Sequence, residues 1–274
     1  MALLRPFSGA APSASLPAMM QGTRRMNRAS LARLPLLAAL APLALGLAAC
    51  KKEGGEGAAA SGPVAAVAPP AGKAWKDVVV STPEGGYLMG NANAPVKLVE
   101  YGSLSCPHCA KLAQEAYPTL VDSYVASGKM SLEFRSFAIH PQDVPLTMLA
   151  ECAGAETFFP LAEELYRNFD AVTERTMKGA DAAGKLGNLP DNQRFIALSD
   201  TLGFTDFFAA RGLPKDQQKA CLGNFAKAQQ IAKFSDAYGQ QGISSTPTLM
   251  INGTKVEGAT WAELKAALAK AGVS

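Results

Sequence analysis

The stretch V-K-L-V-E-Y-G-S-L-S-C-P-H-C, from Val96 to Cys109, joins a strand-like run to a pair of cysteines. Residues 96–101 are rich in β-branched and aromatic side chains and follow a turn-forming segment, so we expect a strand there. Pro107 directly follows the first cysteine, Cys106, and proline is favoured at the first position of a helix. The sequence therefore predicts a strand that leads into a helix whose start carries both cysteines.

Two cysteines separated by two residues at such a helix start are typical of a redox site. Unpaired backbone N–H groups and the helix dipole stabilise negative charge there, so we expect Cys106 to be a thiolate at neutral pH. Cys109 lies one turn deeper on the face of Leu112. It should be shielded and suited to attack a disulfide formed by Cys106. The His108 imidazole would lower the pKa of Cys106 further, unless His108 is an ordinary surface histidine.

Beyond this point the pattern predicts an α/β domain interrupted by an α-helical insertion. Helical spacing continues past Pro118, so we expect a kink there rather than a stop. The other expected elements are a strand over 130–138, helical pieces over 146–153, 160–168, 191–202 and 215–238, a loop over 179–190, a strand over 248–251, a hairpin turn at 252–253 with a partner strand at 255–256, and a helix over 260–271.

Residues 1–49 have the features of an export signal. They carry five arginines and no acidic residue, and an apolar stretch from Leu34 to Ala49 ends in small residues. Met26 would begin a shorter leader of 24 residues, and we expect translation to start there. An uncleaved membrane anchor is the alternative, although sixteen residues that contain two prolines are short for a membrane span.

The leader also accounts for the positive charge of the chain. The formal net charge is +3, but residues 50–274 hold 21 basic and 23 acidic side chains, a net charge of −2. No run of lysines and arginines remains after the leader. Nucleic-acid binding is therefore not expected.

The leader closes on Leu47-Ala48-Ala49-Cys50, which resembles the lipobox of bacterial lipoproteins. The resemblance implies that Cys50 is diacylated and becomes the mature N-terminus, and two acyl chains suffice for stable anchoring. Residues 51–73 consist mainly of alanine, glycine and proline, so we expect residues 50–73 to be a lipidated N-terminus and a flexible tether. The expected location is the periplasm, with the domain held to a membrane through Cys50.

Two segments carry a second resemblance. E-Y-G-S-L-S-C-P-H-C (Glu100–Cys109) and S-S-T-P-T (Ser244–Thr248), with the helical block between them, resemble the DsbA family of thioredoxin-fold oxidoreductases over residues 86–272. In that family, the pair Pro107-His108 between the cysteines is associated with oxidants. The resemblance implies a thioredoxin fold interrupted by an inserted α-helical domain. It divides the chain into a thioredoxin-like part, residues 74–141 and 239–274, and an insertion, residues 142–238.

The resemblance also implies roles for three residues. Thr246-Pro247 would be a cis peptide facing the Cys106 sulfur, which leaves the backbone of Thr246 free to pair with a bound peptide. An ordinary trans turn is the alternative. Glu100 would be the buried acid of the family, with a raised pKa, relaying a proton for Cys109. Its alternative is a partly exposed strand glutamate.

Cys152 and Cys221 remain. Related proteins of this branch carry cysteines at similar places that can pair, which implies a structural disulfide in an oxidising compartment. Two buried free thiols are the alternative. The sequence suggests no partner for His140.

The function implied by the resemblance is that of a thiol oxidase. It would donate a disulfide to reduced or unfolded secreted proteins, and a membrane quinone reductase of the DsbB type would reoxidise it. A disulfide isomerase or reductase of the same fold is the first alternative. Isomerases of this kind dimerise through an extra N-terminal domain that residues 51–95 are too short to supply, so we expect a monomer without a cofactor.

A metal-binding envelope lipoprotein is the second alternative. Cys106, His108 and Cys109 could hold copper or zinc, but the chain has only two histidines and no obvious further ligands. No metal site is therefore expected.

Overall fold

A computed structural model describes residues 64–274. Residues 1–49, Cys50 and residues 51–63 lie outside the described part, so the predicted leader, the lipidation site and most of the tether are not among the residues described. In the described part, no helix is both long enough and apolar enough to cross a membrane.

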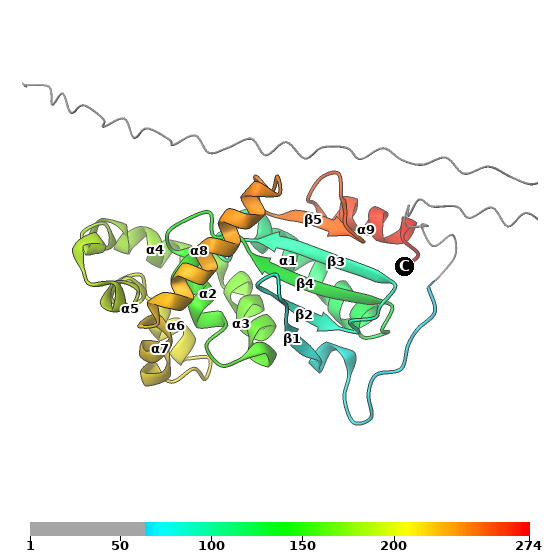
Figure 1. Cartoon of the computed structure of the whole chain (residues 1–274), viewed down its shortest axis with the longest axis horizontal. Helices are drawn as coiled ribbons and strands as arrows, with labels where there is room; N and C mark the ends of the chain where they lie inside the picture. The colour runs from blue at the N-terminus through cyan, green and yellow to red at the C-terminus, as the bar shows by residue number, and fades with distance from the viewer. Residues whose placement is uncertain (1–63) are drawn as a thin grey trace, which may run out of the picture. The chain divides into compact units, whose positions relative to one another are not determined.

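The described part is built around a mixed six-stranded sheet (Figure 1). Its strand order is β1-β2-β4-β3-β5-β6, with bounds β1 Val79–Ser81, β2 Gly86–Gly90, β3 Val96–Gly102, β4 Met130–Ser136, β5 Thr248–Ile251 and β6 Thr254–Lys255. The central strand β3 pairs in parallel with β4 and antiparallel with β5. Sheets with both faces covered favour strands that are apolar throughout. In β4 every residue except Arg135 is buried, although the strand also carries the polar residues Ser131, Glu133 and Ser136.

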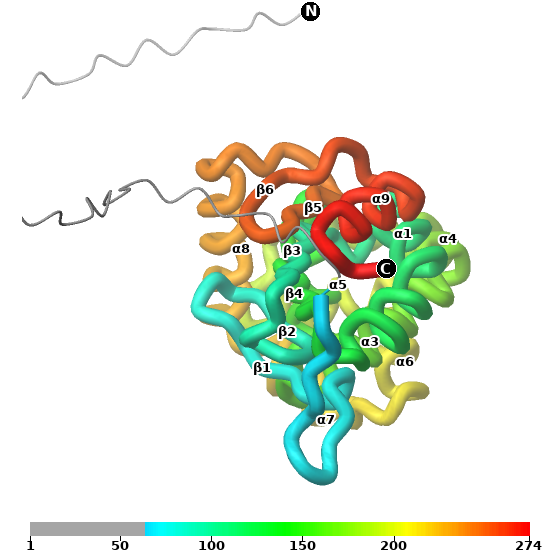
Figure 2. The backbone as a smooth tube through the Cα atoms, turned by 90° about the vertical axis from the view of Figure 1, so that its right-hand side faces the viewer, coloured from blue at the N-terminus to red at the C-terminus, as the bar shows by residue number. Residues whose placement is uncertain are grey.

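Helices cover both faces of the sheet (Figure 2). The helical elements are α1 Pro107–Thr119, α2 Asp143–Ala150, α3 Ala155–Arg167, α4 Phe169–Ala183, α5 Asp191–Thr201, α6 Phe204–Ala209, α7 Lys215–Leu222, α8 Phe225–Gln240, α9 Trp261–Lys270, the short 3-10 helices Trp75–Asp77 and Leu186–Asn188, and a π-helix Leu120–Val125. Helices α1, α3 and α9 lie on one face and α8 on the other, where Tyr238 meets Tyr101 edge-on at 5.0 Å. Helices α2 to α8 follow β4 and precede β5, so the inserted helical region lies where the sequence predicts it.

The first helix passes Pro118, as predicted. Residues Leu120–Val125 continue it as a π-helix, and three of them are buried. Proline lacks the N–H that an α-helix would use at this position, and a wider turn is one way for a helix to continue past such a gap.

Three expectations for the insertion are wrong in detail. Residues 215–238 form two helices rather than one, because Gly223 and Asn224 end α7 and the Asn224 side chain caps α8 by accepting from the Lys227 N–H at 3.3 Å. The expected loop over 179–190 begins five residues late, since α4 runs to Ala183. Most of α4 and all of α6 were not expected. α4 buries no residue fully, although Phe169, Val172 and Ala183 pack against the core.

The hairpin β1–β2 was not expected either. β2 reads G-Y-L-M-G, and glycine normally marks a turn rather than a strand. A Cβ at Gly86 would lie 2.8 Å from the Phe134 carbonyl oxygen, so the glycine is required by the close approach of the neighbouring strand.

The last ten residues of the predicted tether, 64–73, are fastened to the domain. They form no helix or strand, but the Val64 N–H donates to the Gly272 carbonyl at 3.0 Å and the Val67 N–H to that of Ser127 at 2.9 Å. The Trp75 indole N–H donates to the Val67 carbonyl at 2.7 Å. The prediction of a free tether is wrong for this part, because these bonds and the burial of Val64 hold it to the surface.

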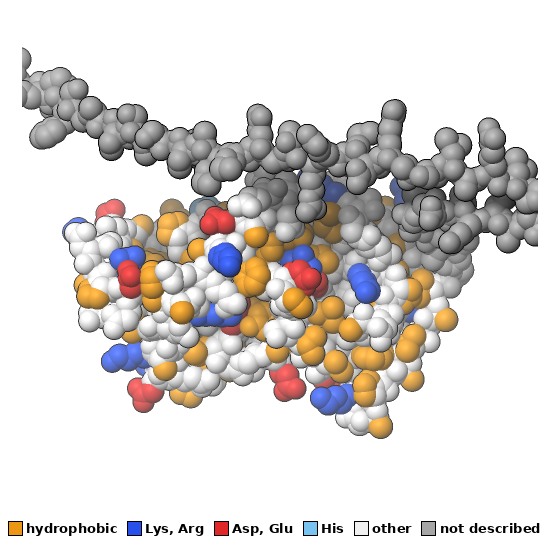
Figure 3. Space-filling model, in the orientation of Figure 1, with side chains coloured by type: hydrophobic (Ala, Val, Ile, Leu, Met, Phe, Trp, Pro, Cys, Tyr) orange, Lys and Arg blue, Asp and Glu red, His pale blue; other side chains and the backbone are white. Residues whose placement is uncertain are grey.

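Acidic and basic side chains alternate on the face seen in Figure 3. Apolar side chains lie scattered between them. On this face the described residues thus form no area of a single charge sign.

Candidate active site

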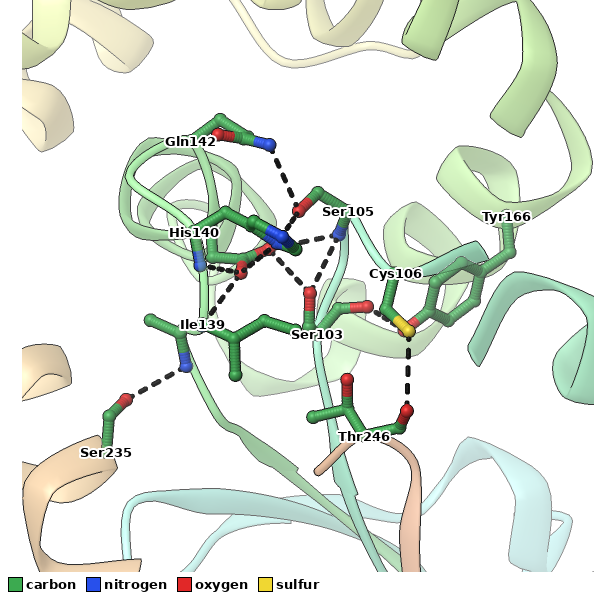
Figure 4. Close-up of polar contacts among 11 residues, drawn as sticks. Ser103, Ser105, Cys106, Ile139, His140, Gln142, Tyr166, Ser235 and Thr246 are labelled. Atoms are coloured by element: carbon green, nitrogen blue, oxygen red, sulfur yellow. Dashed lines mark hydrogen bonds and ion pairs between the residues drawn. The ribbon is translucent and has the colours of Figure 1, made fainter. Parts of the chain in front are cut away.

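The two predicted halves of the site meet at one edge of the sheet. Tyr101 near the end of β3 pairs with Thr248 at the start of β5, so the segment after β3 and the segment before β5 lie side by side. The first carries Cys106, and the second carries Thr246-Pro247, which is a cis peptide. The Cys106 thiol donates to the Thr246 carbonyl at 3.5 Å (Figure 4). The structure therefore brings together the residues predicted to bind a peptide and to attack it.

Cys106 occupies the N-cap of α1, with Pro107 as the first helical residue. Hydrogen bonding from the Cys109 thiol is the largest cause that lowers the pKa of Cys106, and the total shift brings it from 9.0 to about 5. Burial opposes the shift, whereas the Thr246 side chain and the backbone N–H groups of Cys109 and His108 support it. Cys106 is therefore a thiolate at neutral pH, stabilised by the helix start and by its partner thiol.

Cys109 has the opposite character. It is 0% exposed, and burial is the main cause that raises its pKa well above the ordinary value. Its hydrogen bond to Cys106 and the nearby Glu100 carboxyl act in the same direction. Cys106 and Cys109 are both free thiols here, so the structure represents the dithiol form. Both side chains are buried, Cys106 with 4% and Cys109 with 0% of the surface exposed, so the pKa values distinguish the two. Cys106 is poised as the nucleophile, and Cys109 is protonated.

Glu100 lies beneath this pair on β3 and is 2% exposed. Burial raises its pKa to about 8, with a further contribution from the Cys106 thiolate. The Tyr117 hydroxyl opposes the shift, although the two groups do not reach hydrogen-bond geometry, and neither Tyr117 Oη nor Glu100 Oε1 has a partner among residues 64–274. A carboxyl with such a pKa can exchange a proton near neutral pH.

Pro107 and His108 are both exposed. The described residues offer no hydrogen bond to the His108 ring, and His108 acts on Cys106 through its backbone N–H. The predicted role of the imidazole stays a prediction, and the structure instead points to the helix start, Cys109 and Thr246 as the groups that stabilise the thiolate.

Replacing Thr246 with valine should destabilise the Cys106 thiolate. The Thr246 hydroxyl oxygen is buried and has no partner among residues 64–274, so it can donate to the thiolate. The carbonyl contact at 3.5 Å suits only the thiol form. We expect the thiolate fraction at pH 5 to fall from about one half to about a quarter or less, measured by thiolate absorbance across a pH titration. Thr147→Val, at another buried threonine, is the control and should leave the curve unchanged. An unchanged curve for Thr246→Val would exclude the hydroxyl as a donor.

Stability should depend on pH differently in the two redox forms. The folded-state pKa of Glu100 is raised, so Glu100 contributes fully to the free energy of unfolding below about pH 4.5. This contribution is lost as the pH rises to about 8. The pKa of Cys106 is lowered, so in the dithiol form its contribution grows as the pH rises from about 5 to 9. The two trends oppose each other in the dithiol form. In the disulfide form Cys106 does not titrate, and the trend of Glu100 remains because burial is its main cause.

We therefore expect the free energy of unfolding of the dithiol form to rise relative to that of the disulfide form. The difference should grow by up to about 1.4 kcal/mol per pH unit between pH 5 and 8. Urea unfolding of both forms at four pH values measures this difference, and groups that titrate alike in both forms cancel from it. Glu100→Gln should flatten the disulfide curve. Parallel curves for the two forms would contradict the low pKa of Cys106.

The two remaining cysteines lie away from this site. Cys152, just after α2, and Cys221, in α7, form a disulfide with an S–S distance of 2.01 Å and a Cα–Cα distance of 5.8 Å. The Gln217 side chain donates to the Cys152 carbonyl at 3.2 Å across the same junction. The bond therefore braces two helices of the insertion.

Sequence reasoning missed the residues whose hydrogen bonds hold the loop before Cys106. Asp143 at the start of α2 accepts hydrogen bonds from the loop before Cys106, and Tyr166 in α3 donates to the Ser103 carbonyl at 3.0 Å. A helix-starting aspartate is a visible signal of a cap, but nothing local indicates that it reaches back forty residues. In residues 64–274 no group of three or more His, Cys, Asp or Glu side chains could hold a metal ion.

Comparisons with known proteins identify the family and the fold. The family model described as Thioredoxin matches residues 82–270. The crystal structure of a protein-disulfide isomerase from Novosphingobium aromaticivorans is 31% identical, with a TM-score of 0.64, and the match covers 68% of this chain and 97% of that one. Wolbachia pipientis alpha-DsbA1 shares the fold at 20% identity and a TM-score of 0.55, covering 70% and 92% of the two chains.

Among curated proteins, a candidate protein-disulfide oxidoreductase of Rickettsia bellii is 25% identical over 189 residues, 69% of this chain and 65% of the relative. The match to its Rickettsia prowazekii counterpart covers 55% of that relative, so the chain spans about two thirds or less of these proteins. The family model, the sheet topology and the inserted helices all indicate the same family. The chain belongs to the DsbA-like family of thioredoxin-fold disulfide oxidoreductases.

Proposed function

We propose that this protein is a thiol oxidase that donates the Cys106–Cys109 disulfide to other proteins. The observation that carries the proposal is the pKa of Cys106, lowered to about 5 at the start of α1. A stable thiolate stabilises the dithiol form, and a stabilised dithiol makes the corresponding disulfide a strong oxidant. The family alone does not distinguish oxidants from reductants, so this stabilisation is the deciding feature.

The reaction follows in two exchanges. A client thiolate attacks the Cys106 sulfur, so a client–Cys106 bond forms, the Cys106–Cys109 bond breaks and Cys109 leaves as a thiolate. A second client thiolate then attacks the client sulfur of the mixed disulfide, and Cys106 leaves as a thiolate. The client has lost two electrons and gained a disulfide, and the enzyme has become the dithiol.

Glu100 would supply the proton for the first exchange. The buried Cys109 thiolate is unfavourable, because burial raises the pKa of Cys109 well above its ordinary value. Glu100 is mostly protonated at pH 7, since its pKa is about 8, so it can protonate Cys109 as the bond breaks. During reoxidation the carboxylate would take the proton back.

Equilibration with glutathione tests the proposal. The fraction of Cys106–Cys109 disulfide at defined ratios of reduced to oxidised glutathione yields the reduction potential. We expect a value well above the roughly −270 mV of thioredoxin, toward the range of roughly −120 to −180 mV. A value near that of thioredoxin would contradict the oxidase.

A disulfide isomerase or reductase is the second candidate, favoured by the 31% identity to a protein titled a protein-disulfide isomerase. Two assays separate the candidates. An oxidase should form disulfides in a fully reduced multi-disulfide client and reduce insulin poorly. An isomerase should instead recover activity from a scrambled client, and a reductase should precipitate insulin efficiently.

We also propose that the protein works in the periplasm, anchored through a lipidated Cys50. The lipobox-like L-A-A-C and the arginine-rich leader support this location. Cys50→Ser should move the protein from the membrane fraction to the soluble fraction, and an unchanged distribution would contradict lipidation. Clients would be reduced secreted proteins, a quinone-linked membrane protein of the DsbB type would restore the disulfide, and the enzyme would act as a monomer.

A further inference from the structure

One buried carboxylate joins the two loops that flank the nucleophile. Asp143, the first residue of α2, accepts from the Ser103 hydroxyl at 2.8 Å and the Ser105 N–H at 3.0 Å through Oδ1. Through Oδ2 it accepts from the N–H groups of Ile139 at 3.0 Å and His140 at 2.9 Å. Figure 4 shows the segment of Ser103 and Ser105 beside that of Ile139 and His140, with dashed contacts between them. The loop before the nucleophile is thereby tied to the loop after β4.

The loop before the nucleophile has further supports at Ser103. Its carbonyl accepts from the Tyr166 hydroxyl at 3.0 Å and from the Cys106 N–H at 3.2 Å. Ser103 is thus held through its side chain by α2 and through its backbone by α3. Because Ser103 in turn receives the Cys106 N–H, its position fixes where the N-cap of α1 lies.

The burial of Asp143 argues that this arrangement has a use beyond capping. The side chain is 2% exposed, and a buried carboxylate is costly unless donors surround it. Among residues 64–274 its ion-pair contact is the His140 ring, 3.7 Å from Oδ2, and the His140 side chain is 47% exposed. The four donors offset much of the cost. Asp143 contacts the Cys106 segment through Ser103 and Ser105, so the structure offers it a route to the thiolate through position.

We propose that Asp143 is a positioning residue that holds the Ser103–Ser105 loop so that the Cys106 sulfur stays aligned with the N–H groups of α1 and with Thr246. The inference rests on the proposed function, because it assigns Asp143 to the same thiol chemistry. The thiolate needs the N–H groups of His108 and Cys109 and the Thr246 side chain, and hydrogen bonds weaken steeply with misalignment. Loosening of this loop would therefore weaken the hydrogen bonds to the Cys106 thiolate and make the thiolate less stable.

Asp143→Asn provides a directed test. The amide has one acceptor and one donor side, so it can serve only one pair of donors well. The oxygen should face Ile139 and His140, whose N–H groups cannot turn away. The amide nitrogen would then face Ser103, whose hydroxyl can turn to accept, and the Ser105 N–H would keep only its longer contact with the Ser103 hydroxyl oxygen, at 3.3 Å. The substitution should therefore loosen the loop before Cys106 and spare the other loop.

The readouts are iodoacetamide alkylation of Cys106 at pH 5 and the glutathione equilibrium. For Asp143→Asn we expect alkylation to slow by about threefold or more, because fewer molecules carry the thiolate, and the disulfide to become a weaker oxidant. Ser103→Ala, which removes one donor, should shift both readouts in the same direction by less. If Asp143→Asn does not fold, the milder Ser103→Ala is the test. An unchanged alkylation rate and an unchanged glutathione equilibrium in Ser103→Ala would overturn the inference.

Gln218→Ala is the matched control. Gln218 is 0% exposed in α7 and donates to two carbonyls, those of Thr205 at 3.0 Å and Leu213 at 2.8 Å. It should lower stability without moving the alkylation rate or the glutathione equilibrium. If Asp143→Asn behaves like Gln218→Ala, Asp143 is structural only and the inference fails. If the wild-type protein itself has a potential near that of thioredoxin, the proposed oxidase fails, whatever Asp143 does.

Discussion

Cys106→Ala should abolish disulfide exchange, reducing it to the background rate of free thiols. Its pKa of about 5 makes Cys106 about 99% thiolate at pH 7, whereas an ordinary cysteine is ionised only to about 3%. Cys109 cannot replace it, because it is fully buried and its pKa is raised. Cys109→Ala should act differently: the nucleophile remains but the resolving thiol is gone, so mixed disulfides with clients should accumulate.

Refolding of a reduced client and non-reducing gels measure these two outcomes. The paired variant Cys152→Ala/Cys221→Ala is the control for loss of cysteines, and it should keep its exchange activity because that disulfide lies in the insertion. Appreciable exchange by Cys106→Ala, or trapped clients on Cys106→Ala rather than on Cys109→Ala, would contradict the assignment of the two roles.

Removal of the Cys152–Cys221 disulfide should produce the second large effect, on stability. The bond joins residues 69 apart, and in the chain-entropy model a loop of this length contributes about 4 kcal/mol through the unfolded chain. For a domain of this size the midpoint of thermal unfolding should fall by about 10 °C. The thiolate titration of Cys106 should not change.

Calorimetry of Cys152→Ala/Cys221→Ala against wild type, both with the active-site cysteines oxidised, measures the loss. Treatment of the wild type with a reductant is not equivalent, since it also opens the Cys106–Cys109 bond. An unchanged midpoint would mean that the unfolded chain gains little freedom, as residual structure around the cysteines would cause.

The parts of the site that the sequence predicted depend on local rules. Cys106, Pro107 and Cys109 follow a strand and open a helix, and a helix start stabilises anions wherever it occurs. The positions of Glu100 and of Thr246-Pro247 needed the family resemblance, because strand pairing between β3 and β5 joins segments almost 150 residues apart.

The rest depends on contacts that leave no local trace. Asp143 reads as an ordinary helix-starting residue, and its bond to Ser103 exists only because β4 and the loop after it run beside β3. Gly86 looks like a turn residue until the neighbouring strand is known to approach it. The break between α7 and α8 combines a glycine with a side-chain cap. Helical periodicity reports only the spacing of apolar residues, so it predicts neither of these features.

The hydrogen bonds of residues 64–67 attach the chain at the end of the sheet opposite to Cys106. Val67 binds beside Ser127, just before β4 begins, whereas Cys106 follows the opposite end of the parallel neighbour β3. Val64 is the fourteenth residue after Cys50, so the chain between them spans at most about 50 Å when fully extended. Under the proposed anchoring, the reactive sulfur would look outward into the compartment. Newly exported chains could then reach the sulfur freely. A membrane-embedded protein that reoxidises the enzyme would reach it only after the domain had rotated about its tether.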